Sequence, residues 1–389
     1  MVNINKNFNN LSDGYLFANI ARLIQEAKQK KPKLSILNLG IGDVTIPLSP
    51  IISDAISQAT KELTNAKTHR GYGPSCGFDF LKEAISSNDY INLNIDKDEI
   101  FISLGAKDDI SNIQELFDSN NKIGVSDPTY PVYIDSNIMA GKTDITLLPC
   151  NEENNFQIQP PNIPLDIIYL CSPNNPTGVS LTKETLEKWV KYAKDNDSII
   201  IYDAAYEAFI TSSAPHSIYE IENSKDVAIE IKSFSKKAGF TSLRCGYTVI
   251  PKNIKINSQE LNKLWVRRCE TKSGGASYPI QKGALSLYSE EGKKQTDQII
   301  KTYQKQTSIL KLGMEKKGFK VYGGIDSPYI WCKTLNNINS WDFFKMLLEK
   351  FNVVTMPGSG FGKQGDHFIR ISGFTPLDII YQMLDRINL

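Results

Sequence analysis

The chain has 389 residues, enough for a large domain with a smaller companion, and its 41% hydrophobic and 22% charged side chains are ordinary for a soluble globular protein. Its 44 basic and 43 acidic side chains leave a net charge of +1, which gives no reason to expect a nucleic-acid or membrane partner. The six cysteines form no C-x-x-C pair, and no signal-like or membrane-length apolar run occurs, so we expect a cytoplasmic protein without a metal site or disulfide framework.

Residues 1–45 are expected to form an N-terminal arm and part of a small domain. Apolar residues at intervals of three and four predict a helix with one apolar face, formed by Leu16, Ile20, Leu23 and Ile24. A short strand is predicted over 36–39, where it runs into the glycine loop 40–43. A second helix is predicted over about 49–63, and the glycine-containing loop 68–74 follows it.

Residues 46–285 are expected to form a large α/β domain, because a strand, a glycine or turn, and a helix recur from residue 98 onward. The predicted strands are short and apolar and cover 99–103, 122–125, 167–171, 198–202 and 227–231. Such strands between helices predict a mostly parallel sheet covered on both faces. Ligand sites in these sheets lie at the carboxyl ends of the strands, where the chain has Lys107, Asn175, Asp203 and Ser233.

Residues 286–389 are expected to form a smaller α+β domain. The pattern changes after Pro251, where long polar helices are predicted over about 258–272 and 289–317. The remaining predicted elements are short strands and one helix, at 320–322, 329–331, 340–351, 353–354 and 367–370.

The stretch 231–247 contains the groups that pyridoxal phosphate needs at its aldehyde and phosphate. Lys236 can form a Schiff base with an aldehyde. Ser233, Ser235 and Arg244 can bind a phosphate through hydroxyls and a guanidinium. Ala106 and Lys107 begin a predicted helix, whose N-terminal amides offer further donors to an anion.

Other candidates suit the ring and an amino-acid substrate. Asp203, at the end of an apolar strand, can keep the pyridine nitrogen protonated, and Tyr206 and Asn175 can donate to the phenolic oxygen. Tyr130 can pack on the ring, and Arg370 can bind a substrate α-carboxylate with two parallel hydrogen bonds. Each alone is equally a turn cap, a core aromatic or a solvated arginine, but their joint placement at successive strand ends favours an enzyme.

An ordered set of motifs resembles the fold-type I pyridoxal-phosphate aminotransferases of class I/II: GYGP, GAK, DPTYP, SPNNPTG, YDAAY, SFSKKAGFTSLRCGY and FIRIS. Within this family the chain is most similar to the LL-diaminopimelate aminotransferases. The resemblance covers nearly the whole chain and implies a large domain with a seven-stranded, mostly parallel sheet, a smaller α+β domain, and a homodimer with shared active sites.

The resemblance also implies roles for individual residues. Lys236 would form the internal aldimine and then move the proton of the substrate's α-carbon, with Asp203 and Tyr206 as its catalytic partners. Tyr72 would reach the phosphate in the neighbouring subunit. Substrate contacts would come from Arg370, Asn175, Tyr15 and the backbone at Gly42.

Two positions of the substrate pocket depart from the family pattern. The family has a glutamate facing the distal end of diaminopimelate where this chain has Ser75, and an asparagine where it has Gly274. A polar contact to a charged substrate group contributes about 1.5–3 kcal/mol. Losing two such contacts is enough to alter specificity, so the cofactor half of the site is intact and the substrate half is changed.

Three functions follow from these observations. The first is an aminotransferase that acts on diaminopimelate or another L-α-amino acid with a polar or basic side chain, with 2-oxoglutarate as acceptor. The second is elimination and cyclisation of a hydroxylated arginine-like amino acid; loss of the glutamate argues against it unless Asp43 replaces that carboxylate. The third is a non-catalytic protein of the same fold, which has no need to keep Lys236, Asp203 and Arg370 together.

Overall fold

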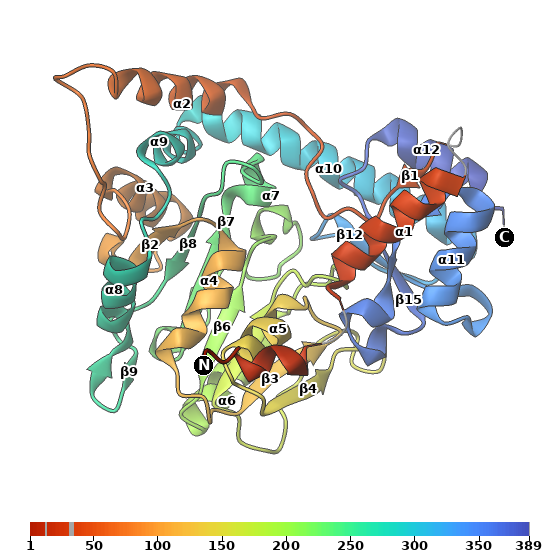
Figure 1. The fold of residues 1–389 in the computed structure, drawn as a ribbon, viewed down its shortest axis with the longest axis horizontal. Coiled ribbons are helices and arrows are strands. Elements are labelled where there is room, and N and C mark those ends of the chain that lie inside the picture. Colours follow the sequence, from red (N-terminus) through yellow and green to blue (C-terminus); the bar gives the residue numbers. More distant parts are fainter. Residues whose placement is uncertain (12–13, 31–34, 389) are drawn as a thin grey trace.

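The computed structural model describes residues 1–11, 14–30 and 35–388, and its larger part is built on a seven-stranded sheet (Figure 1). The strands lie in the order β2-β8-β7-β6-β5-β3-β4. Their bounds are β2 (Ile100–Ser103), β3 (Ile123–Asp127), β4 (Ile145–Pro149), β5 (Ile167–Cys171), β6 (Ile199–Asp203), β7 (Ala228–Ser233) and β8 (Gly246–Val249). Neighbours from β7 to β4 are parallel, whereas β8 is antiparallel to both β2 and β7.

The predicted mostly parallel sheet is therefore confirmed, with two strands that the sequence pattern did not indicate. β8 begins at Gly246, near the end of the motif stretch 231–247, and its residues were not predicted as a strand. β4 is an edge strand with partly exposed side chains, so it lacks the apolar run of the central strands. The helix predicted over about 258–272 is wrong at residues 258–260. There β9 (Lys255–Ile256) and β10 (Gln259–Glu260) form a hairpin before α8 begins.

Side chains alternate between the two faces of the sheet and enter two different cores. On β5, Ile168 and Leu170 belong to one hydrophobic cluster, while Ile167 and Tyr169 belong to another. This is the two-residue period of a strand buried on both sides. The helices of this part are α2 (Pro50–Glu62), α3 (Asp79–Asp89), α4 (Ala106–Ile113), α5 (Val132–Met139), α6 (Lys183–Asp195), α7 (Phe234–Ala238), α8 (Leu261–Lys272) and α9 (Tyr278–Ser286).

The smaller part contains a four-stranded antiparallel sheet in the order β11-β12-β15-β14. Its elements are β11 (Val321–Gly323), β12 (Tyr329–Lys333), α11 (Ser340–Phe351), β13 (Val353–Val354), β14 (Met356–Pro357), β15 (Phe368–Ser372) and α12 (Leu377–Arg386). β1 (Leu37–Asn38) pairs in parallel with β13, so the N-terminal segment packs with the C-terminal part. The exact division at 1–45, 46–285 and 286–389 stays a prediction.

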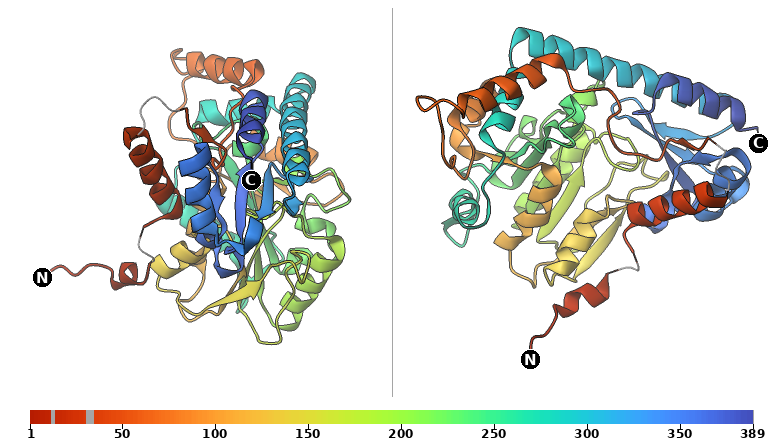
Figure 2. Two further views of the ribbon diagram at one scale, coloured as in Figure 1. Left: turned by 90° about the vertical axis from the view of Figure 1, so that its right-hand side faces the viewer. Right: turned by 45° about the horizontal axis from the view of Figure 1, so that its top comes forward.

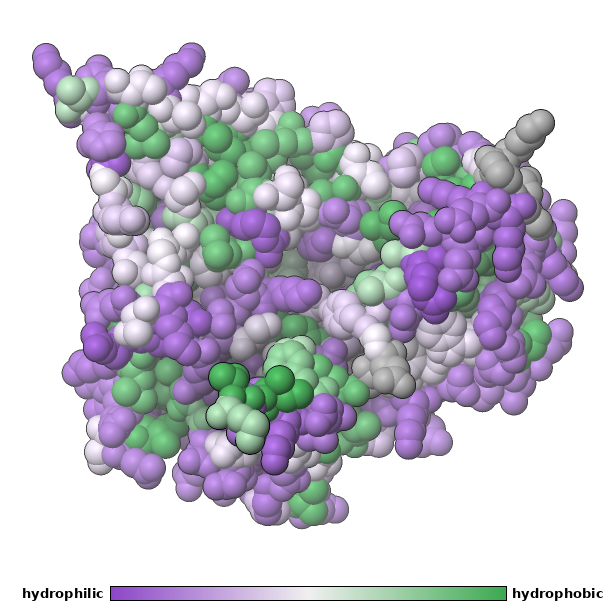
Figure 3. All heavy atoms as spheres, in the orientation of Figure 1, coloured by the Kyte–Doolittle hydropathy of each residue, from purple (hydrophilic) through white to green (hydrophobic). Residues whose placement is uncertain are grey.

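Two helices connect the parts. α10 (Glu290–Lys316) runs across the molecule above both parts in Figure 1, and α1 (Leu16–Lys30) lies in front of the smaller part. The side chain of Tyr303 on α10 packs with Phe209 of the larger part, while Leu310, about two turns further along the helix, enters the core of the smaller part. Figure 2 shows the same helix lying along both parts in a second view. In the orientation of Figure 1, the space-filling surface is hollowed near its middle, between the two parts (Figure 3).

Candidate active site

A cavity of about 440 Å³ lies at the carboxyl ends of β5, β6 and β7. Thirteen of the residues singled out in the sequence line it: Tyr15, Gly42, Ala106, Lys107, Tyr130, Asn175, Asp203, Tyr206, Ser233, Ser235, Lys236, Arg244 and Arg370. They come from both parts of the chain and from sequence positions far apart. The parallel strands explain this convergence, because their carboxyl ends meet at one edge of the sheet.

Lys236 lies on the short helix α7 and points into the cavity. The side chain of Ser233 caps this helix by accepting a hydrogen bond from the Ser235 amide at 3.1 Å. The Lys236 Nζ donates a hydrogen bond to the carbonyl oxygen of Gly42 and lies 3.9 Å from Asp43 Oδ1. Burial lowers the pKa of Lys236 to about 8 although Asp43 acts to raise it. A large fraction of this amine is therefore neutral near pH 8, as a nucleophile or proton acceptor requires.

Asp203 ends β6 and is only 5% exposed. Burial raises its pKa, while a hydrogen bond from the Tyr133 hydroxyl at 2.6 Å and one from the Ala205 amide at 3.0 Å act to lower it. Tyr133 was not among the predicted site residues. It lies on α5, three residues after Tyr130, but its contact with Asp203 depends on how α5 packs against the end of β6.

The helix α4 presents its N-terminus to the cavity. Its N-cap is Gly105 with φ of 120°, which makes no side-chain cap, so the first amides of the helix keep their donors for another partner. A Cβ at Gly105 would lie 2.8 Å from Arg244 Nη2, so a larger residue would displace the guanidinium. Ser233, Ser235 and Arg244 line the same cavity. These donors together form a cradle for an anion.

Arg370 on β15 is 1% exposed and has well-defined partners. Its Nη1 donates to Asn175 Oδ1 at 2.6 Å and its Nη2 donates to the Gly40 carbonyl at 2.8 Å. The buried Nε has no hydrogen-bond partner, and no carboxylate of the described residues forms an ion pair with this guanidinium. A buried cation without an anion is costly, so the site suits a ligand carboxylate.

Two tyrosines face each other beside Arg370. The hydroxyls of Tyr206 and Tyr329 lie 2.9 Å apart, and the Arg370 guanidinium lies 4.3 Å from the Tyr329 ring centroid. Tyr329 was not predicted as a site residue, because nothing in its local sequence distinguishes it from a core residue. A Cβ at Gly42 would lie 2.7 Å from the Tyr329 hydroxyl, which explains the need for glycine at that position.

Three predicted residues lie outside this cavity: Tyr72, Ser75 and Gly274. Tyr72 is fully exposed, and a Cβ at Gly274 would have no atom of the chain within 4 Å. A Cβ at the next residue, Gly275, would lie 3.5 Å from the carbonyl oxygen of Ser75, so the two departures from the family pattern lie close together. Within one chain they do not contribute to the site.

The residues that line the cavity fit pyridoxal phosphate. They include an amine with a lowered pKa, a buried carboxylate with a tyrosine donor, and the anion cradle at the start of α4. Among the residues 1–11, 14–30 and 35–388, no cluster of three potential metal ligands occurs. The same described residues include no helix long and apolar enough to cross a membrane.

Comparisons with known proteins agree with this description. The model of the family "Aminotransferase class I and II" matches residues 35–379. An LL-diaminopimelate aminotransferase of Methanosphaera stadtmanae is 46% identical over 405 residues, with 100% of this chain and 98% of the relative covered. One of Prochlorococcus marinus is 47% identical over 404 residues, with 100% and 99% covered.

A solved structure gives the same result for the fold. The L,L-diaminopimelate aminotransferase of Chlamydomonas reinhardtii matches with a TM-score of 0.94 at 42% identity, over 99% of this chain and 98% of that one. The agreement extends over both sheets, so the predicted fold is confirmed. The chain therefore belongs to the class I and II aminotransferases and, like them, depends on pyridoxal phosphate.

Proposed function

We propose that the protein is an LL-diaminopimelate aminotransferase that uses 2-oxoglutarate as amino acceptor. The observation that carries the proposal is that Lys236, Asp203 and Arg370 all line one cavity. Each side chain lies in an environment that suits its proposed role. The names of full-length relatives at 46% and 47% identity support the substrate.

The proposed chemistry assigns each group a step. Arg370 binds the substrate α-carboxylate, because its guanidinium is held in place by Asn175 and Gly40 and has a free Nε. Lys236 Nζ would accept the proton from the substrate's α-carbon and hold it within the cavity for its return. Asp203, which accepts a hydrogen bond from the Tyr133 hydroxyl, would hold the proton of the ring nitrogen. When bound, the cofactor supplies an aldehyde that exchanges with the amino group and a ring that accepts electrons.

The active site is proposed to be shared within a homodimer. The arm carries exposed apolar side chains, namely Met1, Val2, Ile4 and Phe8, and Tyr72 is exposed as well. Exposed apolar groups of this number suit packing against another chain. Figure 3 shows hydrophobic side chains gathered on this face near the N-terminal arm. In the dimer Tyr72, Ser75 and Gly274 would reach the partner's cavity, and their lack of contact with their own cavity supports this arrangement.

The two departures from the family pattern affect how the proposed site binds the polar far end of the substrate. Ser75 and Gly274 offer the distal ammonium and carboxylate fewer polar contacts than a glutamate and an asparagine. We therefore expect a weaker preference for diaminopimelate over shorter amino acids with polar or basic side chains. A difference of about 10–100-fold in kcat/KM corresponds to the loss of one such contact, and a larger difference to the loss of both.

The deciding experiment is an amino-acid panel with 2-oxoglutarate. Keto products and glutamate from LL-diaminopimelate, and none without 2-oxoglutarate, are the expected result. Ser75→Glu is expected to raise kcat/KM for LL-diaminopimelate relative to the other amino acids. Loss of water from a substrate without any acceptor would overturn the proposal. The relatives reported above are all named aminotransferases, so the cyclisation alternative gains no support from them.

We also propose that the protein acts in the cytoplasm. All six cysteines are free in the structure, which suits a reducing compartment. Alkylation of the purified protein under native and denaturing conditions, without reductant, is expected to modify six thiols in the denatured state. Recovery of disulfide-linked peptides from freshly isolated protein would contradict this location.

A further inference from the structure

Lys237 and Glu207 are the chain neighbours of two cavity residues, Lys236 and Tyr206, but do not line the cavity themselves. The Lys237 Nζ lies 3.4 Å from Asp89 Oδ1 and 3.8 Å from Glu207 Oε1. The ion pair with Glu207 therefore joins two segments, α7 and the 3-10 helix η4 (Glu207–Phe209), at the residues next to those that face the cavity.

These charges are well shielded from water. The side chains of Lys237, Glu207 and Asp89 are 23%, 14% and 11% exposed. Burial acts to lower the pKa of Lys237, but Asp89 and Glu207 outweigh it and hold the pKa above its ordinary value. Asp89 ends α3 and accepts further hydrogen bonds at 2.7 Å from the hydroxyls of Tyr247 and Tyr288. Lys237 is therefore a charged anchor between α3 and η4.

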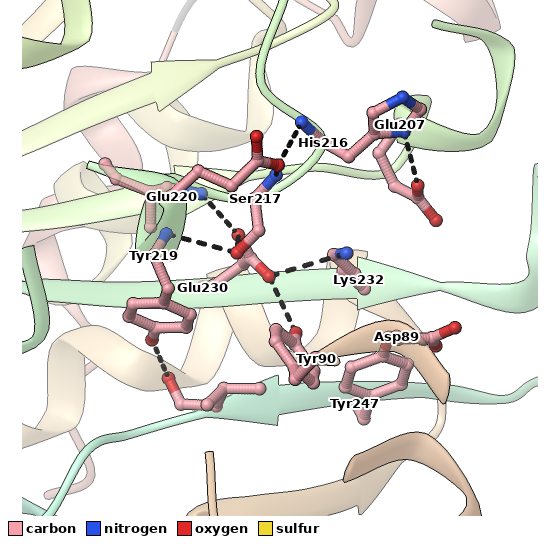
Figure 4. A network of polar contacts seen from close by, with 12 residues as sticks. Asp89, Tyr90, Glu207, His216, Ser217, Tyr219, Glu220, Glu230, Lys232 and Tyr247 are labelled. Atoms are coloured by element: carbon pink, nitrogen blue, oxygen red, sulfur yellow. Dashed lines mark hydrogen bonds and ion pairs between the residues drawn. The ribbon is translucent and has the colours of Figure 1, made fainter. Parts of the chain in front are cut away.

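Glu207 belongs to a larger network of buried charges (Figure 4). Its Oε2 lies 3.5 Å from His216 Nδ1, and the figure shows these two side chains facing each other. Burial acts to raise the pKa of Glu207, but Lys232 and Lys237 hold it well below its ordinary range. Lys232 in turn pairs with Glu230 at 3.6 Å. Glu207 is thus ionised and held from two sides.

The geometry of α7 makes an anchor necessary. The helix has five residues, and a single turn does not hold its own orientation in water. Successive residues of a helix point about 100° apart, so a fixed Lys237 also fixes the direction of Lys236. Glu207 holds the other side in the same way, because Tyr206 is the residue directly before η4.

We propose that Lys237 and Glu207 are positioning residues that fix the Lys236 amine and the Tyr206 hydroxyl relative to each other across the cavity. The proposal rests on the proposed role of Lys236 in the reaction. It differs from an electrostatic role, because the charged groups that act on Lys236 itself are Asp43, Arg370 and Arg244.

The two roles predict different signs when one charge is removed. If Lys237 and Glu207 acted only through their fields, Lys237→Met would raise the pKa of Lys236 and Glu207→Gln would lower it. If they position α7, both changes loosen the helix, expose the Lys236 amine to water and raise its pKa. Glu207→Gln is therefore the decisive variant, because it changes little in shape and gives opposite results under the two models.

The test uses the full-length chain freed of cofactor. Competitive labelling with an amine-reactive reagent, read by mass spectrometry of the Lys236 peptide, gives the pKa of Lys236. The labelling covers about pH 6 to 11, a range that includes both the lowered pKa of about 8 and the ordinary lysine value of about 10.4. We expect Lys237→Met and Glu207→Gln each to raise the pKa of Lys236 by about one unit. In the reconstituted enzyme, kcat is expected to fall about tenfold with a smaller change in KM. Lys237→Arg, which keeps the ion pair, is expected to restore both values.

Lys333→Met is a matched control, because it removes the cation of another partly buried ion pair, with Glu152, away from the cavity. It is expected to lower thermal stability and leave Lys236 unchanged. A lowered or unchanged pKa of Lys236 in Glu207→Gln overturns the proposal. If Lys237→Met does not fold, Glu207→Gln alone decides. Failure of the proposed function is distinguishable, because Lys236→Ala would then retain covalently bound cofactor.

Discussion

Arg370 Nη1 donates a 2.6 Å hydrogen bond to Asn175 Oδ1, although 195 residues separate the two along the chain. Arg370 lies on β15 of the four-stranded sheet, and Asn175 follows β5 of the seven-stranded sheet. One contact therefore couples the residue proposed to bind the substrate carboxylate to the residue proposed to face the cofactor. The geometry of the site depends on how the two sheets lie relative to each other.

The first prediction concerns this contact. Arg370→Lys keeps the charge but removes the paired Nη donors, so we expect kcat/KM to fall about 10–100-fold, mainly through KM. The measurement is steady-state kinetics with the amino-acid substrate varied. Arg268→Lys is the control, because Arg268 pairs with Glu115 away from the cavity. An unchanged KM in Arg370→Lys would remove Arg370 from the substrate site.

The second prediction separates two adjacent lysines. Lys236→Ala is expected to abolish covalent attachment of the cofactor, because the Lys236 side chain lines the cavity and its Nζ lies beside Gly42 and Asp43. Lys237→Ala is expected to keep the attachment, since Lys237 pairs with Asp89 behind the cavity. Borohydride reduction followed by peptide mass spectrometry identifies the modified residue. The opposite pattern would reverse the assignment.

The third prediction concerns pH. The pKa of Lys236 is lowered to about 8 by burial, so protonated amine dominates below that pH and neutral amine above it. The rate at which cofactor-free protein recombines with pyridoxal phosphate should therefore rise about tenfold per pH unit below the pKa and level off above it. Stopped-flow absorbance measures this rate. A rate that keeps rising toward ~10.4, the ordinary value for lysine, would contradict burial of the amine.

The fourth prediction tests the partner that only the structure revealed. Tyr133→Phe removes a hydrogen bond that lowers the pKa of Asp203, so that pKa should rise by about one unit. Because a carboxylate with a raised pKa is neutralised at higher pH, the acid limb of the kcat profile should move to higher pH. Tyr169→Phe is the control, since Tyr169 stacks on Tyr133 but does not line the cavity. Matching profiles for the two variants would exclude this role of Tyr133.

The fifth prediction tests the shared site. Lys236→Ala and Tyr72→Ala should each be nearly inactive as homodimers. Mixed after unfolding and refolding, they should recover about a quarter of wild-type activity, because half the dimers then contain one site with both residues intact. Activity assays across mixing ratios provide the measurement. Independent subunits would show no recovery, and Tyr72 would then have no role in the partner's cavity.

The sequence by itself determined which groups meet in the cavity where the cofactor is proposed to bind. Lys107, Asn175, Asp203 and Ser233 each follow a predicted strand, and parallel strands bring their carboxyl ends to one edge. The order of these groups along the chain was therefore enough to predict that they meet. Local pattern also determined the long helix α10, predicted over 289–317 and observed at Glu290–Lys316.

Only the tertiary structure decided which side chains support those groups. Tyr133 reaches Asp203 across 70 residues and Tyr329 reaches Tyr206 across 123, and no sequence spacing encodes contacts made by packing one element on another. The same is true of Lys237 and Glu207, whose pairing depends on how α7 and η4 lie together. For Tyr72, Ser75 and Gly274 even one folded chain is insufficient, because their proposed partners belong to a second copy.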